Sequence, residues 1–185
     1  MKKDGFLINM SLKKNSKTKN GFTLIELLIV IAIIAILAAI IFVALDPLKR
    51  FQDSRDAARW SNVSFLLSAI KIDQIDNGGY YLPEISGLTD NAVYMIGSAS
   101  AGCANQNAYC DINVGGNGLC VDLSGLVTEG YLGSVPVSPN GDGSWDSTIT
   151  GYTLEKRSTG IITVRSCESE NIDEIFLTSE ISSAR

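Results

Sequence analysis

An uninterrupted apolar segment constrains this chain more than any other feature of its sequence. From Phe22 to Leu45 the only charged side chain is Glu26. These residues form a helix roughly 36 Å long, and the hydrocarbon core of a bilayer is about 30 Å thick, so we expect a membrane-spanning helix over residues 22–45. A carboxylate in such a segment costs about 3 kcal/mol, and less near the interface, so Glu26 should have a functional role and a partner.

Charge on either side of the span predicts its orientation. Residues 1–21 carry six lysines and one acid, a net charge of +5, and since the whole chain carries −5 the remainder carries −10. Positive charge before a first span keeps the amino end cytoplasmic, so residues after Leu45 should cross the membrane. Basic residues beyond the span weaken this asymmetry; they are Lys49, Arg50, Arg55 and Arg59. The acidic remainder argues against nucleic acid as a partner.

The position of Gly21 separates the segment from an ordinary secretory signal. Such a signal has an apolar stretch of about 7–15 residues followed by a small-x-small cleavage site. Here the apolar run is longer, no Ala-x-Ala follows it, and the glycine precedes it. A peptidase that cuts after Gly21 would remove the lysine-rich leader and leave the membrane helix on the product.

Residues 19–34 resemble the class III signal of type IV pilins and pseudopilins; they read Lys-Asn-Gly-Phe-Thr-Leu-Ile-Glu-Leu-Leu-Ile-Val-Ile-Ala-Ile-Ile. The resemblance is close over residues 19–45, and a weaker resemblance continues to about Pro83. It implies that a prepilin peptidase, which is also an N-methyltransferase, cuts between Gly21 and Phe22 and methylates the new amine of Phe22. It also implies that Glu26 pairs with that amine on a neighbouring copy, during polymerisation at an inner-membrane assembly platform.

The physical chemistry of Glu26 agrees with this resemblance. Cleavage creates a positive amine four residues from the carboxylate, and in a bundle of helices each carboxylate can face a neighbour's amine. Two costly ions in membrane lipid then become one charge-assisted pair, which rewards correct axial register more than it adds stability.

Helical periodicity continues after the apolar run. Asp46-Pro47 predicts either a kink in one helix or the end of one helix and the start of another. Residues 48–76 read as an amphipathic helix because apolar residues recur at spacings of three and four, and Gly78-Gly79 should end it. The apolar positions are Ala57, Trp60, Val63, Leu66, Leu67 and Ile70.

The remaining residues, 79–185, predict a β-rich head. Residues 152–156 and 161–165 read as strands around a Ser158-Thr159-Gly160 turn, with a third strand over 175–178 and a short helix over 122–132. An antiparallel sheet on a long helix gives an α+β fold, which the pilin resemblance also implies. The expected organisation is a leader at 1–21, a membrane or filament-core helix at 22–45, an amphipathic continuation at 46–78 and the head.

Four cysteines lie in the head: Cys103, Cys110, Cys120 and Cys167. None forms a Cys-x-x-Cys pair, and the chain has no histidine to complete a zinc site. Outside the cytoplasm the simplest interpretation is two disulfides, whose pairing the sequence does not decide among three possibilities. We favour a local Cys103–Cys110 clip and a longer Cys120–Cys167 closure.

No arrangement of residues predicts an enzyme. Without histidine there is no visible nucleophile–base pair, and the acidic pairs Glu168/Glu170 and Asp173/Glu174 read as a solvated stretch. One loop offers oxygen atoms at alternate positions, as a calcium loop does, although no glutamate follows at the EF-hand spacing. We favour a turn in solvent and keep calcium as the weaker alternative, so no cofactor is assigned; the residues are Asn140, Asp142, Ser144 and Asp146.

These observations predict a type IV pilin-like subunit, inserted once in the membrane and then assembled into a surface or periplasmic filament. The alternatives are a pseudopilin of type II secretion, a minor pilin for adhesion or DNA uptake, and a signal-anchored protein that does not polymerise. The last alternative predicts an uncut amino terminus.

Overall fold

The computed structural model describes residues 21–115, 118, 120–172 and 174–179. The leader expected over residues 1–21 therefore lies outside the described residues, apart from Gly21. The chain divides into two compact units, residues 1–45 and residues 46–185.

The described part of the first unit is a single helix, α1 (Leu24–Leu45). Branched residues are common in it, and lipid favours a helix for such a segment because no other local structure satisfies its backbone polar groups. The helix is long and apolar enough to cross a membrane, and none of the apolar stretch is buried against the protein itself. The expected apolar helix is confirmed, and its apolar surface has no partner within the described chain.

The second unit begins with a new helix, α2 (Pro47–Asp76). Asp46 has a left-handed backbone, with φ of 36°, and its side chain accepts a hydrogen bond from the backbone N–H of Lys49. Pro47 takes the first helical position, where its missing N–H costs nothing. Of the two interpretations of Asp46-Pro47, the structure therefore has a new helix with its own N-cap.

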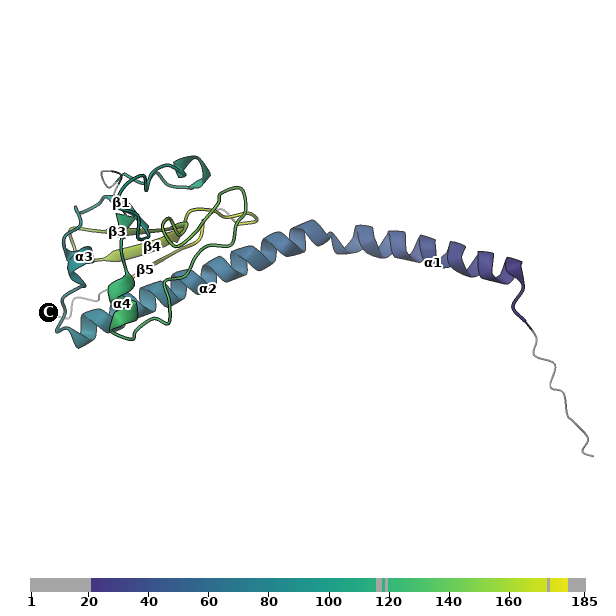
Figure 1. The fold of residues 1–185 in the computed structure, drawn as a ribbon, viewed down its shortest axis with the longest axis horizontal. Helices are drawn as coiled ribbons and strands as arrows, with labels where there is room; N and C mark the ends of the chain where they lie inside the picture. Colours follow the sequence, from purple (N-terminus) through teal and green to yellow (C-terminus); the bar gives the residue numbers. More distant parts are fainter. Residues whose placement is uncertain (1–20, 116–117, 119, 173, 180–185) are drawn as a thin grey trace, which may run out of the picture. The chain divides into compact units, whose positions relative to one another are not determined.

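Glycines end α2 as expected. Gly78 has φ of 67° and Gly79 has φ of 97°, backbone conformations that glycine adopts without strain. The chain then passes through α3 (Pro83–Ser86) into the sheet, where Figure 1 shows α2 running along the strands.

Within the described residues the sheet has five strands, in the order β2-β1-β3-β4-β5. Their bounds are β1 Val93–Ile96, β2 Cys120–Val121, β3 Tyr152–Lys156, β4 Ile162–Ser166 and β5 Phe176–Thr178. The hairpin of β3 and β4 and the third strand confirm the sequence prediction, with β4 shifted by one residue. Two short helical segments complete the head: η1 (Asn107–Tyr109) and α4 (Ser124–Thr128).

The sheet differs from the prediction in being mixed. The pair β1–β2 is parallel, with Met95 opposite Cys120, and the other pairs are antiparallel. A two-residue edge strand is too short to show an alternating pattern in the sequence, so β2 was not predicted. The α+β class is unaffected.

Alternation along the strands places a core on each face of the sheet. Tyr152 and Leu154 of β3 belong to the large core that also contains the buried face of α2. Met95 alternates with its neighbours in β1 and belongs to a second, smaller core on the other side, with Cys103, Val114, Trp145 and Cys167. The α2 residues of the large core are Val63, Leu66, Leu67, Ala69 and Ile70.

Candidate assembly site

The start of α1 is a reciprocal capping box. Glu26 Oε2 accepts hydrogen bonds from the backbone N–H of Thr23 (2.8 Å) and from its hydroxyl (2.7 Å), and the N–H of Glu26 donates to Thr23 Oγ1 (3.2 Å). A threonine N-cap with a glutamate three residues later satisfies two otherwise unpaired N–H groups. The carboxylate that the sequence marks as expensive therefore has a local partner.

This arrangement leaves part of Glu26 available. Its bonds to Thr23 use Oε2, and Oε1 makes no hydrogen bond within the described chain. Phe22 is 80% exposed, so its amine would be accessible after a cut at Gly21. A side chain added at Gly21 would meet nothing within 4 Å. The cleavage role of Gly21, the methylation of Phe22 and the pairing role of Glu26 stay predictions.

A second apolar surface lies on α2. At about 100° per residue, Phe51, Phe65 and Ile72 fall on one stripe, and the buried face centred near Val63 and Ile70 is nearly opposite. All three stripe residues are exposed, as are Leu48 and Ile75 near the two ends of the helix. On one side α2 therefore packs against its own head, and on the other it exposes these large apolar side chains.

Arg59 is the centre of a buried ionic cluster that joins α2 to the head. Its side chain is 0% exposed, and all five of its N–H groups have acceptors. Nη1 donates to Asp56 Oδ1 (2.8 Å) and Glu170 Oε1 (2.8 Å), Nη2 to Glu168 Oε2 (2.7 Å) and the Pro139 carbonyl (3.1 Å), and Nε to Ser138 Oγ (3.3 Å).

A second arginine extends the cluster. Arg55 donates two hydrogen bonds to the Glu170 carboxylate, from Nε to Oε1 at 2.6 Å and from Nη2 to Oε2. Desolvation acts to lower the pKa of Arg59, but its hydrogen bonds to Glu170 and Asp56 raise it overall, so the group stays charged. Hydrogen bonding from Arg55 holds the pKa of Glu170 below its usual value. Removing one member would leave uncompensated buried charge, so the cluster fixes the head on α2.

This ionic cluster was not predicted from the sequence, and it corrects the interpretation of two of its acids. Glu168 and Glu170 are not part of a solvated acidic stretch, since Glu168 is only 6% exposed and both pair with Arg59. The sequence did hold a signal for the cluster: Arg55, Asp56 and Arg59 are polar residues on the face of α2 that packs against the head. It could not be used, because their partners lie more than 100 residues away in the sequence.

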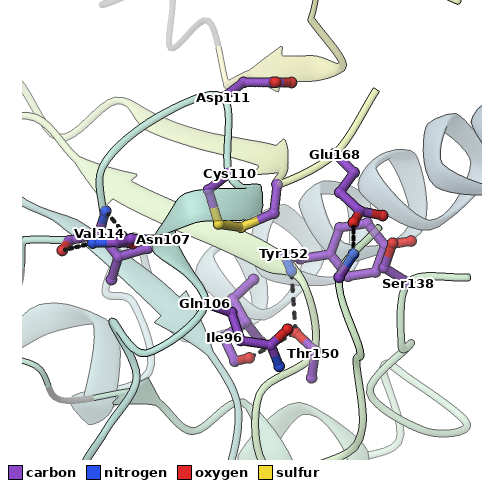
Figure 2. The surroundings of a disulfide bond; sticks show 12 residues. Ile96, Gln106, Asn107, Cys110, Asp111, Val114, Ser138, Thr150, Tyr152 and Glu168 are labelled. Atoms are coloured by element: carbon purple, nitrogen blue, oxygen red, sulfur yellow. Dashed lines mark hydrogen bonds between the residues drawn. A yellow bond between two sulfur atoms is a disulfide. The ribbon is translucent and has the colours of Figure 1, made fainter. Parts of the chain in front are cut away.

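Two disulfides bind the loops, and their pairing differs from our preference. The bonds are Cys103–Cys120 and Cys110–Cys167, not Cys103–Cys110 and Cys120–Cys167. Backbone hydrogen bonds explain the result, because Cys103 N–H donates to the Gly118 carbonyl and Asp111 N–H donates to the Cys167 carbonyl. Each cysteine of the loop is thus held beside a distant strand. Figure 2 shows the Cys110 disulfide in the neighbourhood of Glu168 and Tyr152.

A polar cavity of about 540 Å³ opens beside the cluster. It is lined from α2 by Leu48, Gln52 and Arg55, and from the loops by acidic groups that include Asp111 and Asp142. Burial raises the pKa of Asp111, and the Ser169 hydroxyl, which donates to it at 2.9 Å, offsets part of that rise.

The four loop residues considered for calcium do not converge in the structure. Asn140 Oδ1 accepts from the backbone N–H of Trp145 (2.8 Å), and Asp146 Oδ1 accepts from the N–H groups of Thr148 (2.7 Å) and Ile149 (3.1 Å). Asp142 lines the cavity, and the Ser144 N–H donates to Gln106 (2.9 Å). Among the described residues no group of three acidic, cysteine or histidine side chains could hold a metal ion. Calcium binding at this loop stays a prediction.

Comparisons with known proteins show which family the chain is similar to, independently of the structure. Residues 16–42 match the family model described as the prokaryotic N-terminal methylation motif. The chain is 41% identical over 107 residues to the type IV wide pilus major component PilA4 of Thermus thermophilus, covering 52% of this chain and 73% of that protein. It is 32% identical over 148 residues to fimbrial protein Q of Moraxella bovis, covering 72% of this chain and 87% of that protein. No solved structure matches.

Proposed function

This chain belongs to the type IV pilin family, and on that premise we propose that it is a structural subunit of a surface pilus. The observation that carries the proposal is the extent of the matches. At 107 and 148 residues they are far longer than the methylation motif at 16–42, so the similarity extends well beyond that motif. Both relatives are named as pilus or fimbrial components, which favours a pilus over a secretion pseudopilin.

Assembly would use the two apolar surfaces already described. After a cut at Gly21, α1 offers an apolar surface all round, and the stripe on α2 offers a second one. Packing such helices together removes apolar surface from water at about 25 cal/mol per Å² wherever they leave the bilayer. The free Oε1 of Glu26 would face the methylated amine of a neighbouring copy and set the axial register.

The chemistry of the head supports its placement outside the cytoplasm. Two disulfides persist in an oxidising compartment, and all four cysteines take part in them. The lysine-rich leader favours the same orientation. Before assembly the chain would thus be a single-pass membrane protein, and the peptidase would act from the cytoplasmic side.

Electron microscopy of cells tests the proposal. Deleting the gene should remove surface filaments, and restoring the full chain should return them with this subunit as their main component by mass spectrometry. Loss of protein export without any change in surface filaments would contradict the pilus assignment and favour the pseudopilin alternative. Filaments that contain the chain only at low copy number would favour a minor pilin.

A further inference from the structure

Two cations at the start of α2 have no side-chain partner among the residues that the structure describes. The side chains of Lys49 and Arg50 are exposed, and across the described residues neither forms an ion pair or a hydrogen bond. They occupy the first turn of α2, where the helix macrodipole disfavours positive charge. They also lie on the translocated side of the span, against the usual distribution of lysine and arginine. An external anionic partner would offset this unfavourable placement.

The acidic cavity lies on a different side of the same helical turns. Leu48, Gln52 and Arg55 line it and fall within a sector of about 60° on α2, whereas Arg50 lies about opposite and Lys49 about 90° away. Neither cation can therefore lie on the cavity side of its own helix. A contact between cations and cavity joins two different surfaces, so it is a heterologous contact between copies, the kind that builds a filament.

The charge of the cavity complements these cations. Glu168 pairs with the buried Arg59, and Glu170 pairs with Arg59 and with the partly exposed Arg55, but Asp142 is exposed and has no hydrogen bond or ion pair within the part of the chain that is described. Asp111 accepts one hydrogen bond, from Ser169. The cavity, at about 540 Å³, is large enough for the end of a long basic side chain.

We propose that Lys49 and Arg50 of one copy dock at the Asp111 and Asp142 edge of this cavity on the next copy. The inference rests on the proposed function, because it names which surfaces of the heads meet once the subunits assemble. Such a contact selects the correct neighbour and orientation, while the apolar helices supply most of the association energy. It also explains why basic residues persist just beyond the span.

Zero-length carbodiimide crosslinking of wild-type filaments tests the contact. This reagent joins an amine to a carboxylate only when the two touch. The expected products form a ladder of dimers and higher multiples of the subunit, each link made with loss of one water, and they contain a peptide that links Lys49 to Asp142 or Asp111. Intact filaments whose crosslinked dimers lack this peptide would overturn the docking proposal and leave the pilus proposal standing. Absence of filaments would instead count against the proposed function.

Charge exchange in the full chain gives a second test. The double variant Lys49→Glu/Arg50→Glu should lower filament yield about tenfold, because it opposes like charges across the contact. Adding Asp111→Lys and Asp142→Lys should restore the yield to within about twofold, and Arg157→Glu, an exposed cation elsewhere in the head, should have no effect. No loss with the first variant, or no recovery with the fourfold variant, contradicts the contact; loss of membrane retention without recovery would assign the cations to lipid phosphate.

Discussion

Glu26 and Arg59 are two costly charges that the molecule satisfies in different ways. Glu26 has its described partner, Thr23, three residues away, in a capping box at the start of an apolar helix. Arg59 is fully buried and draws two of its carboxylate partners from 109 and 111 residues away. The first solution is local and leaves an oxygen free for another molecule. The second is long-range, complete and closed, which suits a structural role rather than assembly.

The largest expected effect comes from removing the charge of Glu26 while keeping its cap. Glu26→Gln can still form a capping box, since glutamine suits that position, but it carries no charge for a neighbour's amine. We expect normal membrane insertion and at least a tenfold loss of filament yield, which corresponds to about 1.4 kcal/mol. Quantitative immunoblotting of sheared filaments and of membranes measures both.

Thr23→Ala is the matched control for this variant. It removes the cap hydroxyl, at a cost of about 1 kcal/mol to the helix, and keeps the carboxylate. If Thr23→Ala lowers filament yield as much as Glu26→Gln does, the role of Glu26 is capping and the pairing role is wrong.

Cleavage at Gly21 gives the next effect. Because a side chain at this position meets nothing in the structure, Gly21→Leu should not disturb folding, yet it should leave the leader attached. Gel mobility and intact mass of the membrane-bound protein report this directly. Normal processing of the variant would remove the peptidase assignment.

Breaking the closed cluster should destabilise the head. Arg59→Leu leaves Asp56, Glu168 and Glu170 with only Arg55 nearby, and such a loss costs about 3–5 kcal/mol. Denaturant unfolding of the full chain in detergent measures it, with Arg157→Gln as an exposed control expected within about 0.5 kcal/mol. A change below about 1 kcal/mol for Arg59→Leu would show that the cluster does not hold the head on α2.

The pH dependence of stability should show the same cluster. The pKa of Glu170 is depressed, chiefly by Arg55, so its stabilising contribution is present above the unfolded value of about 4.3 and is lost as pH falls through the lower folded value. Glu170→Gln should therefore flatten the fall in melting temperature below about pH 4. Glu174→Gln, an exposed acid, should leave that fall unchanged; equal curves for Glu170→Gln and the wild type would contradict the pairing.

Calcium should have the smallest effect of all. The four loop residues considered do not converge, and two of their oxygens already accept backbone N–H groups, so any binding there would be weak, with a Kd no tighter than about 10⁻³ M. Calorimetric titration of the full chain measures it, with Asp142→Asn as the control. No heat and no change in melting temperature would remove the site.

The same comparison explains what the sequence could predict. Segment α1, its lone acid and the end of α2 at Gly78 follow from patterns a few residues long, and each was predictable. Hairpin β3–β4 was also predictable because its strands alternate and a short turn joins them.

Features that depend on distant segments were not predictable. The mixed sheet requires β2, a two-residue strand that pairs in parallel with β1. The disulfide pairing depends on where Cys103 and Cys110 meet the strands, and four cysteines alone leave three choices. Glu168 reads as a surface acid until the fold brings Arg59 to it.

The intact mass and amino-terminal sequence of the subunit in purified filaments test the central claim most directly. We predict a chain that starts at methylated Phe22 and lacks the hydrogens of two disulfides. A chain that still carries residues 1–21, or that begins at an unmethylated residue elsewhere, would contradict the account of how Gly21, Phe22 and Glu26 work together.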